Sequence, residues 1–468
     1  MSNKLIGEIL LVLMFLSEWT QGSSDKPSEG IITLPLIPHH VQRQRRLEAD
    51  PLAMIPDALY QGFGTHYVDL WVGTPPQRQT VIVDTGSSIT SFPCSECANC
   101  GTGYHIDEFF QELNSVTFHI ADCTGCTIGY CQRSTSQCEL SMSYQEGSSW
   151  NAFEAKDTIY IGGHHDTPLD HSKESFSLTF GCQTHLTGLF KTQLADGIAG
   201  MEMSDSSLWR QAFDQRAIHS HAFSLCFSRQ PEASRDGTGA GVMTLGGPSD
   251  TRLHTTNMVY AQQDNSNGWF KVHIRAVYLR RGGGTSVQPS ANNSNTTRLV
   301  TVQGVTENEL NNGDVIVDSG TTDTYLSVML AGPFRDAYKT IMDGADWDPD
   351  TPVTLSEKKL LDMPTILIQL QGWEFGDNDP MAEGMASSID GSHPHDIIVA
   401  VPPTHYMEYS VKTKKYSPRF YFSEYSGGVL GANFMMGHDI FFDAEKHRLG
   451  FAESDCDYET VSQMEESG

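Results

Sequence analysis

Residues 81–88 read VIVDTGSS and residues 315–322 read VIVDSGTT, so one short motif occurs in each half of the chain. Each copy begins with β-branched residues, which favour a strand, and ends in a glycine and small hydroxyl residues, which favour a tight turn. Each turn presents one carboxylate, Asp84 in the first copy and Asp318 in the second. The repeat predicts two duplicated lobes that face each other across an approximate two-fold axis, with both carboxylates at the seam.

Two carboxylates in contact can act together as an acid and a base, which neither can do alone. They cannot both ionise easily, because each negative charge opposes the other. We expect them to share one proton, so that one acts as a base while the other acts as an acid. Such a pair is suited to adding water to a carbonyl group. The sequence therefore predicts chemistry that uses no cofactor and no metal ion.

The motif resembles the paired active-site motifs of the pepsin-like aspartic proteases. Further segments occur in that family's order: YVDLWVGTPPQ at residues 67–77, ADGIAG at residues 195–200 and GVLGANF at residues 428–434. The resemblance covers roughly residues 60–456. It implies an all-β, bilobal fold with pseudo-two-fold symmetry and a cleft between the lobes. It also implies an aspartic endopeptidase that acts on a peptide or protein substrate, as a monomer.

The resemblance assigns roles to the residues of the two loops. Asp84 and Asp318 would be catalytic: the ionised carboxylate deprotonates a water as it attacks the scissile carbonyl, and the protonated one donates to the carbonyl oxygen. Six neighbours would support them in pairs: Thr85 with Ser319 to tie the loops together, Gly86 with Gly320 to let the substrate backbone approach, and Ser87 with Thr321 to hold the outer carboxylate oxygens.

Residues 141–148, SMSYQEGS, correspond to the flap, a hairpin that closes over the substrate in this family. Tyr144 takes the place of the flap tyrosine, and its ring is expected to cap the bound peptide. The chain departs from pepsin at two positions. Ser91 stands where a tryptophan usually bonds the flap tyrosine, and Gln145 stands where a glycine is usual. We therefore expect the flap to move differently from that of pepsin.

Within the family, the chain is most similar to the plasmepsin V and nepenthesin-like branch. Seven of its ten cysteines lie in a cysteine-rich insertion at residues 94–138, and DTGSSITSFPC at residues 84–94 resembles plasmepsin V. In that branch an acid of the flap helps to hold an arginine of the substrate. Glu146 would take this role, and the alternative is a carboxylate that points into solvent.

The ten cysteines favour disulfides in an exported chain. With Cys182, the insertion has eight cysteines that can pair internally, but the sequence does not fix their connectivity. Their CxxC spacings also suit a structural zinc site, which an oxidising compartment disfavours. Cys226 and Cys456 remain. Their positions resemble a pair that joins the chain ends in beta-secretase-like relatives, so we expect a bridge between the lobes.

The order of segments predicts an exported, processed enzyme. The predicted segments are a signal peptide at 1–22, a prosegment at 23–57, a first lobe at 58–247, a second lobe at 248–456 and a polar tail at 457–468. Arg43–Arg46 has the form of a proprotein-convertase site, or is a solvated basic patch. No later stretch is apolar for about 18 residues, so we expect no membrane anchor in this chain.

Composition limits the partners and the compartment. Lys and Arg number 30 against 58 Asp and Glu, giving a formal charge of -28, which argues against nucleic acid as a partner. The negative charge favours solubility. Alternatively, an acidic compartment would protonate some carboxylates and so relieve their repulsion. We expect a place in the secretory pathway, whether endoplasmic reticulum, endolysosome or cell exterior, and glycans at Asn292 and Asn295. Short helices are predicted at residues 206–215 and 328–342.

Three functions remain open. The first is a selective processing protease that favours sites containing arginine, which Glu146 and the missing tryptophan support. The second is a degradative protease of broad specificity. The third is a non-catalytic homologue that binds peptides or traps inhibitors, which the presence of both Asp84 and Asp318 disfavours.

Overall fold

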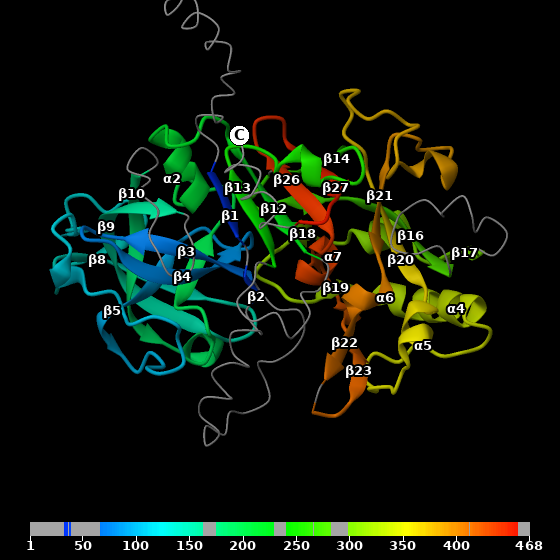
Figure 1. The fold of residues 1–468 in the computed structure, drawn as a ribbon, viewed down its shortest axis with the longest axis horizontal. Helices are drawn as coiled ribbons and strands as arrows, with labels where there is room; N and C mark the ends of the chain where they lie inside the picture. The colour runs from blue at the N-terminus through cyan, green and yellow to red at the C-terminus, as the bar shows by residue number, and fades with distance from the viewer. Residues whose placement is uncertain are drawn as a thin grey trace, which may run out of the picture.

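Strands dominate the computed structural model of the chain, and the all-β prediction is confirmed (Figure 1). The structure describes residues 32–35, 37–38, 66–161, 175–228, 240–264, 266–281, 298–410 and 412–456. The predicted signal peptide, the Arg43–Arg46 site, the sequons at Asn292 and Asn295 and the tail at 457–468 lie outside these ranges.

The first half of the chain forms one ten-stranded sheet, whose main path runs β2-β3-β4-β11-β5-β10-β9-β8-β7, with β6 paired to β9. Its strands are β2 (Ile37–Pro38), β3 (His66–Val72), β4 (Gln77–Asp84), β5 (Ser91–Ala98), β6 (His119–Ile120), β7 (Tyr130–Gln132), β8 (Gln137–Ser143), β9 (Ser149–Ile161), β10 (Phe176–Leu186) and β11 (Gly197–Gly200). The last six residues of β4 are buried, as expected for a strand covered on both faces.

The second half forms smaller sheets. A five-stranded sheet has the order β15-β18-β25-β19-β24, a four-stranded sheet has the order β17-β16-β20-β21, and β22 pairs with β23. The strands are β15 (Lys271–Val272), β16 (Ile274–Arg281), β17 (Arg298–Thr301), β18 (Val315–Val317), β19 (Thr324–Ser327), β20 (Thr365–Leu370), β21 (Ile397–Val401), β22 (Met407–Ser410), β23 (Lys415–Pro418), β24 (Phe420–Glu424) and β25 (Gly428–Leu430).

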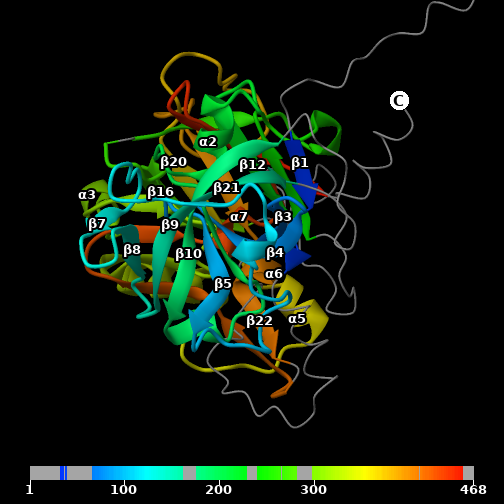
Figure 2. The same cartoon turned by 90° about the vertical axis from the view of Figure 1, so that its left-hand side faces the viewer.

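A six-stranded sheet lies between these two halves and takes strands from both (Figures 1 and 2). Its order is β1-β13-β12-β26-β27-β14. The strands are β1 (Ile32–Pro35), β12 (Ala222–Phe227), β13 (Gly241–Leu245), β14 (Val259–Gln262), β26 (His438–Asp443) and β27 (Arg448–Glu453). β1 and β2 fall inside the predicted prosegment, so part of that segment is paired into the two sheets of the fold.

The two halves repeat one strand arrangement around the predicted aspartate loops. β4 pairs in parallel with β11, and β18 pairs in parallel with β25. The last residue of β11 and the residue directly after β25 are glycines that lie against the loops. A Cβ on Gly200 would lie 2.3 Å from the backbone nitrogen of Ile89, and one on Gly431 would lie 2.2 Å from the carbonyl oxygen of Asp323. No larger residue fits this close backbone approach.

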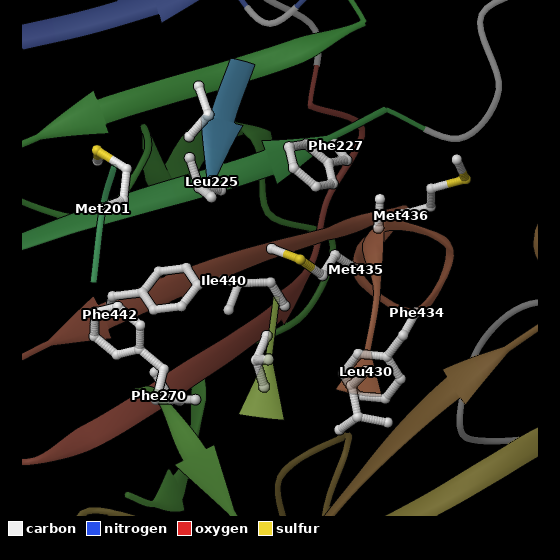
Figure 3. Close-up of a cluster of buried hydrophobic side chains, with 14 of the residues drawn as sticks. Met201, Leu225, Phe227, Phe270, Leu430, Phe434, Met435, Met436, Ile440 and Phe442 are labelled. Carbon is white, nitrogen blue, oxygen red and sulfur yellow. The ribbon is translucent and has the colours of Figure 1, made fainter. Parts of the chain in front are cut away.

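One hydrophobic core extends through both halves and beneath the central sheet. Figure 3 shows Met201, Leu225 and Phe227 of the first half close to side chains from the end of the chain, including Ile440 and Phe442. Phe223 stacks on Phe442 with ring centroids 4.6 Å apart. Because these side chains come from distant parts of the sequence, the lobes share a core and are not independent packing units.

Helices are short. They are α2 (Leu208–Asp214), α3 (Glu307–Leu310), α4 (Ala331–Ile341), α5 (Glu357–Leu361), α6 (Pro403–Tyr406) and α7 (Ala432–Met435), with 3-10 turns at Glu112–Asn114, Gly188–Lys191, Thr251–Leu253, Val328–Leu330 and Ala386–Ser388. Of these, α7 lies in the interior with all four of its residues buried. The helices expected at residues 206–215 and 328–342 are present as α2 and α4. Among the helices of the described ranges, none is both long and apolar enough to span a bilayer.

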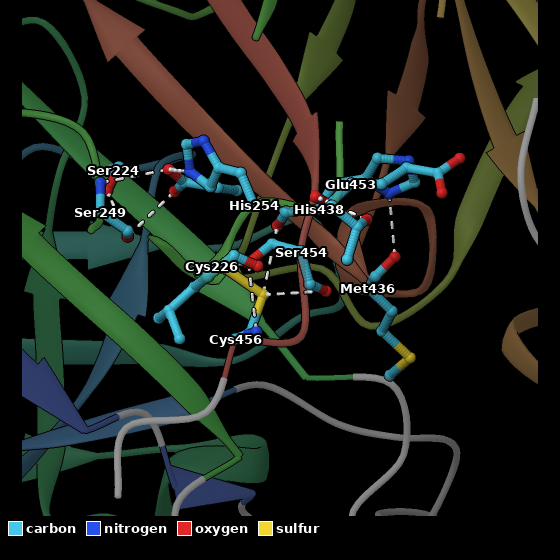
Figure 4. The surroundings of a disulfide bond; sticks show 12 residues. Ser224, Cys226, Ser249, His254, Met436, His438, Glu453, Ser454 and Cys456 are labelled. Carbon is cyan, nitrogen blue, oxygen red and sulfur yellow. Dashed lines mark hydrogen bonds and ion pairs between the residues drawn. A yellow bond between two sulfur atoms is a disulfide. The ribbon is translucent and has the colours of Figure 1, made fainter. Parts of the chain in front are cut away.

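All ten cysteines form disulfides. The pairs are Cys94–Cys182, Cys97–Cys100, Cys123–Cys131, Cys126–Cys138 and Cys226–Cys456. The seven cysteines of the insertion and Cys182 therefore form four disulfides with one another. This pairing replaces the alternative of a structural zinc site. The fifth bond joins β12 to the residues that follow β27, and both cysteines are buried (Figure 4).

The Cys226–Cys456 bond should contribute more to stability than the other disulfides, since it joins residues 230 apart in sequence. We predict that the double serine variant lowers the free energy of unfolding by about 2–5 kcal/mol, measured by chemical denaturation. Serines at Cys97 and Cys100, which are three residues apart, provide the control and should cost less. Non-reducing peptide mapping that recovers Cys226 or Cys456 as a free thiol would contradict this pairing.

Candidate active site

The two aspartate loops meet between the lobes through a reciprocal set of hydrogen bonds. The Thr85 hydroxyl donates to the Val317 carbonyl at 2.9 Å, and the Ser319 hydroxyl donates to the Val83 carbonyl at 2.7 Å. Each hydroxyl also accepts from the backbone N–H of the other residue, at 3.1 and 2.9 Å. Each loop is therefore positioned by the strand of the opposite lobe. All of these groups are buried, so their loss would be costly.

Each carboxyl group is held by its own loop in the same way. The Gly86 N–H donates to Asp84 Oδ1 at 3.0 Å, and the Gly320 N–H donates to Asp318 Oδ1 at 2.9 Å. The second oxygens accept from hydroxyl groups. Ser87 donates to Asp84 Oδ2, and Thr321 donates to Asp318 Oδ2 at 2.5 Å. The structure thus gives both aspartates the same set of donors.

The loops are also packed crosswise, each glycine against the aspartate of the other lobe. A Cβ on Gly320 would lie 2.1 Å from Asp84 Oδ1, and a Cβ on Gly86 would lie 2.9 Å from Asp318 Cγ. These distances are far below van der Waals contact. The glycines therefore allow the two carboxyl groups to approach each other. From the sequence, the same glycines were expected only to let the substrate backbone approach.

Burial and mutual charge make the pair hard to ionise twice. The exposed fractions of Asp84 and Asp318 are 4% and 8%. Burial, and then the charge of Asp318, raise the pKa of Asp84 well above its ordinary value, while the hydrogen bonds from Ser87 and Gly86 oppose that rise. A pair of this kind retains one proton under conditions where isolated aspartates have none.

The predicted flap is the hairpin of β8 and β9. Its turn is closed by hydrogen bonds from the Tyr144 N–H to the Ser148 carbonyl at 2.9 Å and from the Gly147 N–H to the Tyr144 carbonyl at 3.0 Å. The Tyr144 ring packs edge-on against Phe190 with centroids 5.0 Å apart. Burial, and then the charge of Asp84, raise the pKa of Tyr144, while hydrogen bonding with Trp150 and Ser87 opposes that rise.

Trp150 bonds the flap tyrosine, which the sequence analysis missed. Its indole N–H donates to the Tyr144 hydroxyl at 3.3 Å, from the second strand of the same hairpin. Ser91, at the position where the family has its tryptophan, instead accepts from Gln183 at 2.8 Å. The signal in the sequence was a tryptophan six residues after Tyr144. Trp150 lies at the start of β9, where it is paired with both β8 and β10.

A buried acid ties the cysteine-rich insertion to this hairpin. Glu154 of β9 accepts from the backbone N–H groups of residues 127, 128 and 129 and from the Thr127 hydroxyl at 2.6 Å. A row of backbone N–H groups stabilises the ionised carboxylate. The insertion is thus fixed to the strand that carries Trp150. The sequence analysis did not identify Glu154.

Glu146 lies at the exposed tip of the flap turn. The residues that the structure describes offer its carboxylate no ion-pair partner. Its charge makes the smallest of the contributions that raise the pKa of Tyr144. Its side chain is therefore free to contact a bound molecule or the solvent.

A second acidic pair lies behind the first aspartate loop. Asp196, at the start of β11, accepts from the Thr80 backbone N–H at 2.6 Å and from the Thr80 hydroxyl at 2.5 Å, which joins β11 to β4. It also accepts from the Asp107 N–H at 2.9 Å. Burial and the charge of Asp196 raise the pKa of Asp107 to about 7, although Arg78 pairs with Asp107 at 2.8 Å. Within the described residues, no cluster of three acidic, histidine or cysteine side chains could hold a metal ion.

The chain is similar in sequence to one described family and to several named aspartic proteases. The family described as Xylanase inhibitor N-terminal matches residues 66–247. Aspartic protease 5 of Toxoplasma gondii is 30% identical over 213 residues, covering 41% of this chain and 20% of that protein. Plasmepsin V of Plasmodium falciparum is 32% identical over 143 residues, covering 30% and 23%. Aspartyl protease family protein 1 of Arabidopsis thaliana is 24% identical over 417 residues, covering 84% and 67%. The matches to the first two relatives thus span about a fifth of their length.

The close packing of each glycine against the aspartate of the other lobe can be tested by adding a methyl group at one of these glycines. We predict that Gly320→Ala destabilises the protein by about 1–3 kcal/mol, because the added methyl group overlaps the Asp84 carboxyl. Gly391→Ala is the control, since a Cβ there meets no atom within 4 Å. Thermal unfolding of both variants measures the difference. Equal melting temperatures would contradict the close approach of the loops.

Proposed function

Because the chain belongs to the pepsin-like aspartic protease family, we propose that it is an endopeptidase that hydrolyses peptide bonds with a water held between Asp84 and Asp318. The observation that carries the proposal is the symmetric pair: two buried carboxyl groups with matching donors, on loops tied to each other. An isolated aspartate in a turn would need neither the matched donors nor the hydrogen bonds to a second loop.

The chemistry follows from a single shared proton. The ionised carboxylate takes a proton from the water as the water oxygen bonds to the scissile carbonyl carbon, and the protonated carboxyl donates to the carbonyl oxygen. The carbon–nitrogen bond of the tetrahedral intermediate then breaks, and a proton passes to the leaving amine. The shared proton belongs to the pair and is not assigned to one of the two carboxyl groups. Tyr144 would cover the peptide from the flap.

We predict that Asp84→Asn and Asp318→Asn each lower kcat by orders of magnitude without unfolding the protein, because an amide cannot exchange the shared proton. Asp336→Asn, at an exposed position of α4, is the control and should keep full activity. A statine-type transition-state mimic should compete with substrate. Both active-site variants retaining more than about a tenth of wild-type activity would remove the assignment.

A non-catalytic binding protein is the second candidate, since the matched family is described by an inhibitor's N-terminal part. The two functions separate in one measurement. A catalyst converts a peptide library with turnover that Asp84→Asn abolishes. A binding homologue would retain peptides or a partner protein equally well in the wild type and in this variant. The complete set of loop contacts around both aspartates favours the catalyst.

Selective processing in the secretory pathway is the finer part of the proposal. Five disulfides support an oxidising compartment. Glu146 supports selectivity, because an exposed carboxylate at the flap tip can pair in bidentate fashion with a substrate arginine a few residues before the scissile bond. A broad degradative protease would cleave without regard to that residue.

We predict that peptides with arginine at this position exceed matched lysine or alanine peptides by one to two decades in kcat/KM, since a charged hydrogen bond is worth about 1.5–3 kcal/mol. Glu146→Gln should lose the preference while cleaving the alanine peptide as before. Glu96→Gln, an exposed acid on β5, serves as the matched control. A wild type without arginine preference, or a Glu146→Gln variant that keeps it, would favour the degradative function.

A further inference from the structure

Two short lysine-rich segments stand out in the second lobe of a strongly acidic chain. Residues 412–415 read KTKK, and residues 357–361 read EKKLL. The whole chain has 58 acidic residues against 30 Lys and Arg, for a formal charge of -28. Short runs rich in lysine are typical of surfaces that bind polyanions. Such lysines can also be merely solvated, so their placement and their neighbours decide between the two roles.

The first segment forms part of the turn between β22 and β23. The Lys414 N–H donates to the Ser410 carbonyl at 2.7 Å, and residues 412–415 are all exposed. Lys414 has a φ of 55°, a left-handed conformation in which glycine or asparagine is more usual. In Figures 1 and 2 the hairpin projects from the second lobe. The lysines of the turn are therefore presented to the solvent.

The second segment is α5, which lies next to this hairpin (Figures 1 and 2). Val353 exchanges two backbone hydrogen bonds with Tyr416 of β23, both at 2.8 Å, and the chain then enters α5. Lys358 is five residues beyond Val353, which the backbone can span in at most about 18 Å. We call the exposed lysines of the two segments the basic surface: Lys358, Lys359, Lys412, Lys414 and Lys415.

The neighbouring acids are mostly paired with arginines and not with these lysines. Asp362, directly after α5, lies 2.7 Å from Arg281, and Glu408 of β22 lies 3.0 Å from Arg419. Glu357 remains exposed beside the lysines of α5 and reduces the net charge of the basic surface by one. Four lysines form no ion pair and no side-chain hydrogen bond with any residue that the structure describes: Lys358, Lys359, Lys414 and Lys415.

We propose that the basic surface binds a linear sulfated polysaccharide. Each lysine ammonium offers three donors and a full positive charge to a sulfate group. A narrow polymer can lie along the hairpin and α5 without approaching the acidic remainder of the chain, because charges are screened beyond about 8 Å at physiological ionic strength. A bilayer or a bulky acidic protein would bring its own charge against that remainder. Anionic lipids also face the cytoplasm, away from the compartment expected for this chain.

This inference goes beyond the proposed peptidase function and does not depend on it. The basic surface contains neither aspartate of the pair. Asp84→Asn should therefore bind the polysaccharide as tightly as the wild type while it loses peptidase activity. A protein that binds the polymer but cleaves no peptide would contradict the proposed function and leave this inference standing.

The test measures the Kd of the full chain for immobilised heparin over a series of salt concentrations. We predict that the double variant Lys414→Ser/Lys415→Ser weakens binding about tenfold at low salt, because each lost contact releases fewer counterions. The slope of log Kd against log salt should fall by about one for each lysine removed. The double variant Lys358→Ser/Lys359→Ser should behave in the same way.

The control is Lys156→Ser/Lys446→Ser. Both lysines are exposed, one on β9 and one in the turn between β26 and β27, and the variant changes the net charge by the same amount. It should bind heparin as the wild type does. Residues 43–46 contain three arginines, so the differences between variants, and not binding as such, decide the outcome.

Two further probes separate sulfated polysaccharide from other polyanions. Desulfated heparin should bind more weakly than heparin, and vesicles of phosphatidylserine and phosphatidylcholine should not compete with it. No binding of the wild type to heparin at low salt overturns the proposal, as does a double variant of either segment that binds like the wild type. A control variant that loses as much affinity shows an effect of net charge alone and also overturns it. Vesicles that bind in place of heparin assign the basic surface to a membrane instead.

Discussion

The reciprocal hydrogen bonds between Thr85 and Ser319 are the constraint on which the rest of the site depends. They join residues 234 positions apart, and each hydroxyl forms a hydrogen bond with the backbone of the opposite lobe. The central six-stranded sheet and the shared core serve this contact, because a fixed relation between the lobes keeps four buried hydrogen bonds satisfied at once. A small change in the angle between the lobes would leave several of these groups unpaired, so the lobes have little freedom at this point.

Buried acids recur close to both loops. Behind the first loop, burial and the charge of Asp196 raise the pKa of Asp107 to about 7, although Arg78 pairs with Asp107. Behind the second loop, burial raises the pKa of Asp323 to about 7, although Arg419 lies 3.4 Å from it. Carboxyl groups with a raised pKa stabilise the fold most while they keep their protons, so their contribution is largest in acidic solution. The formal charge of -28 adds a weaker, surface contribution in the same direction.

Much of this architecture was predictable from the sequence, because its signals are local. They are the duplicated VIVD motif, the segments ADGIAG and GVLGANF, and the sequence patterns of the short helices. The all-β class and the helices at α2 and α4 followed from them. The donor to Tyr144 was not predicted, because the family has its tryptophan at the position of Ser91 and here Trp150 supplies the bond from within the hairpin. Glu154 and Asp323 were also missed. A buried carboxylate is recognised by the groups that surround it, and those come from strands far away in sequence. The disulfide connectivity within the insertion was undetermined for the same reason.

The bond between Cys226 and Cys456 has a topological consequence. It closes residues 226–456 into a covalent ring that contains Asp318, the whole five-stranded sheet and the shared strands β26 and β27, while Asp84 lies on the chain that enters the ring. A single break of the backbone anywhere inside that ring releases no fragment. Both aspartates stay on one covalent molecule, and the sheets that hold them remain paired through their own hydrogen bonds. A backbone cut in the second lobe would therefore leave the two aspartates covalently connected.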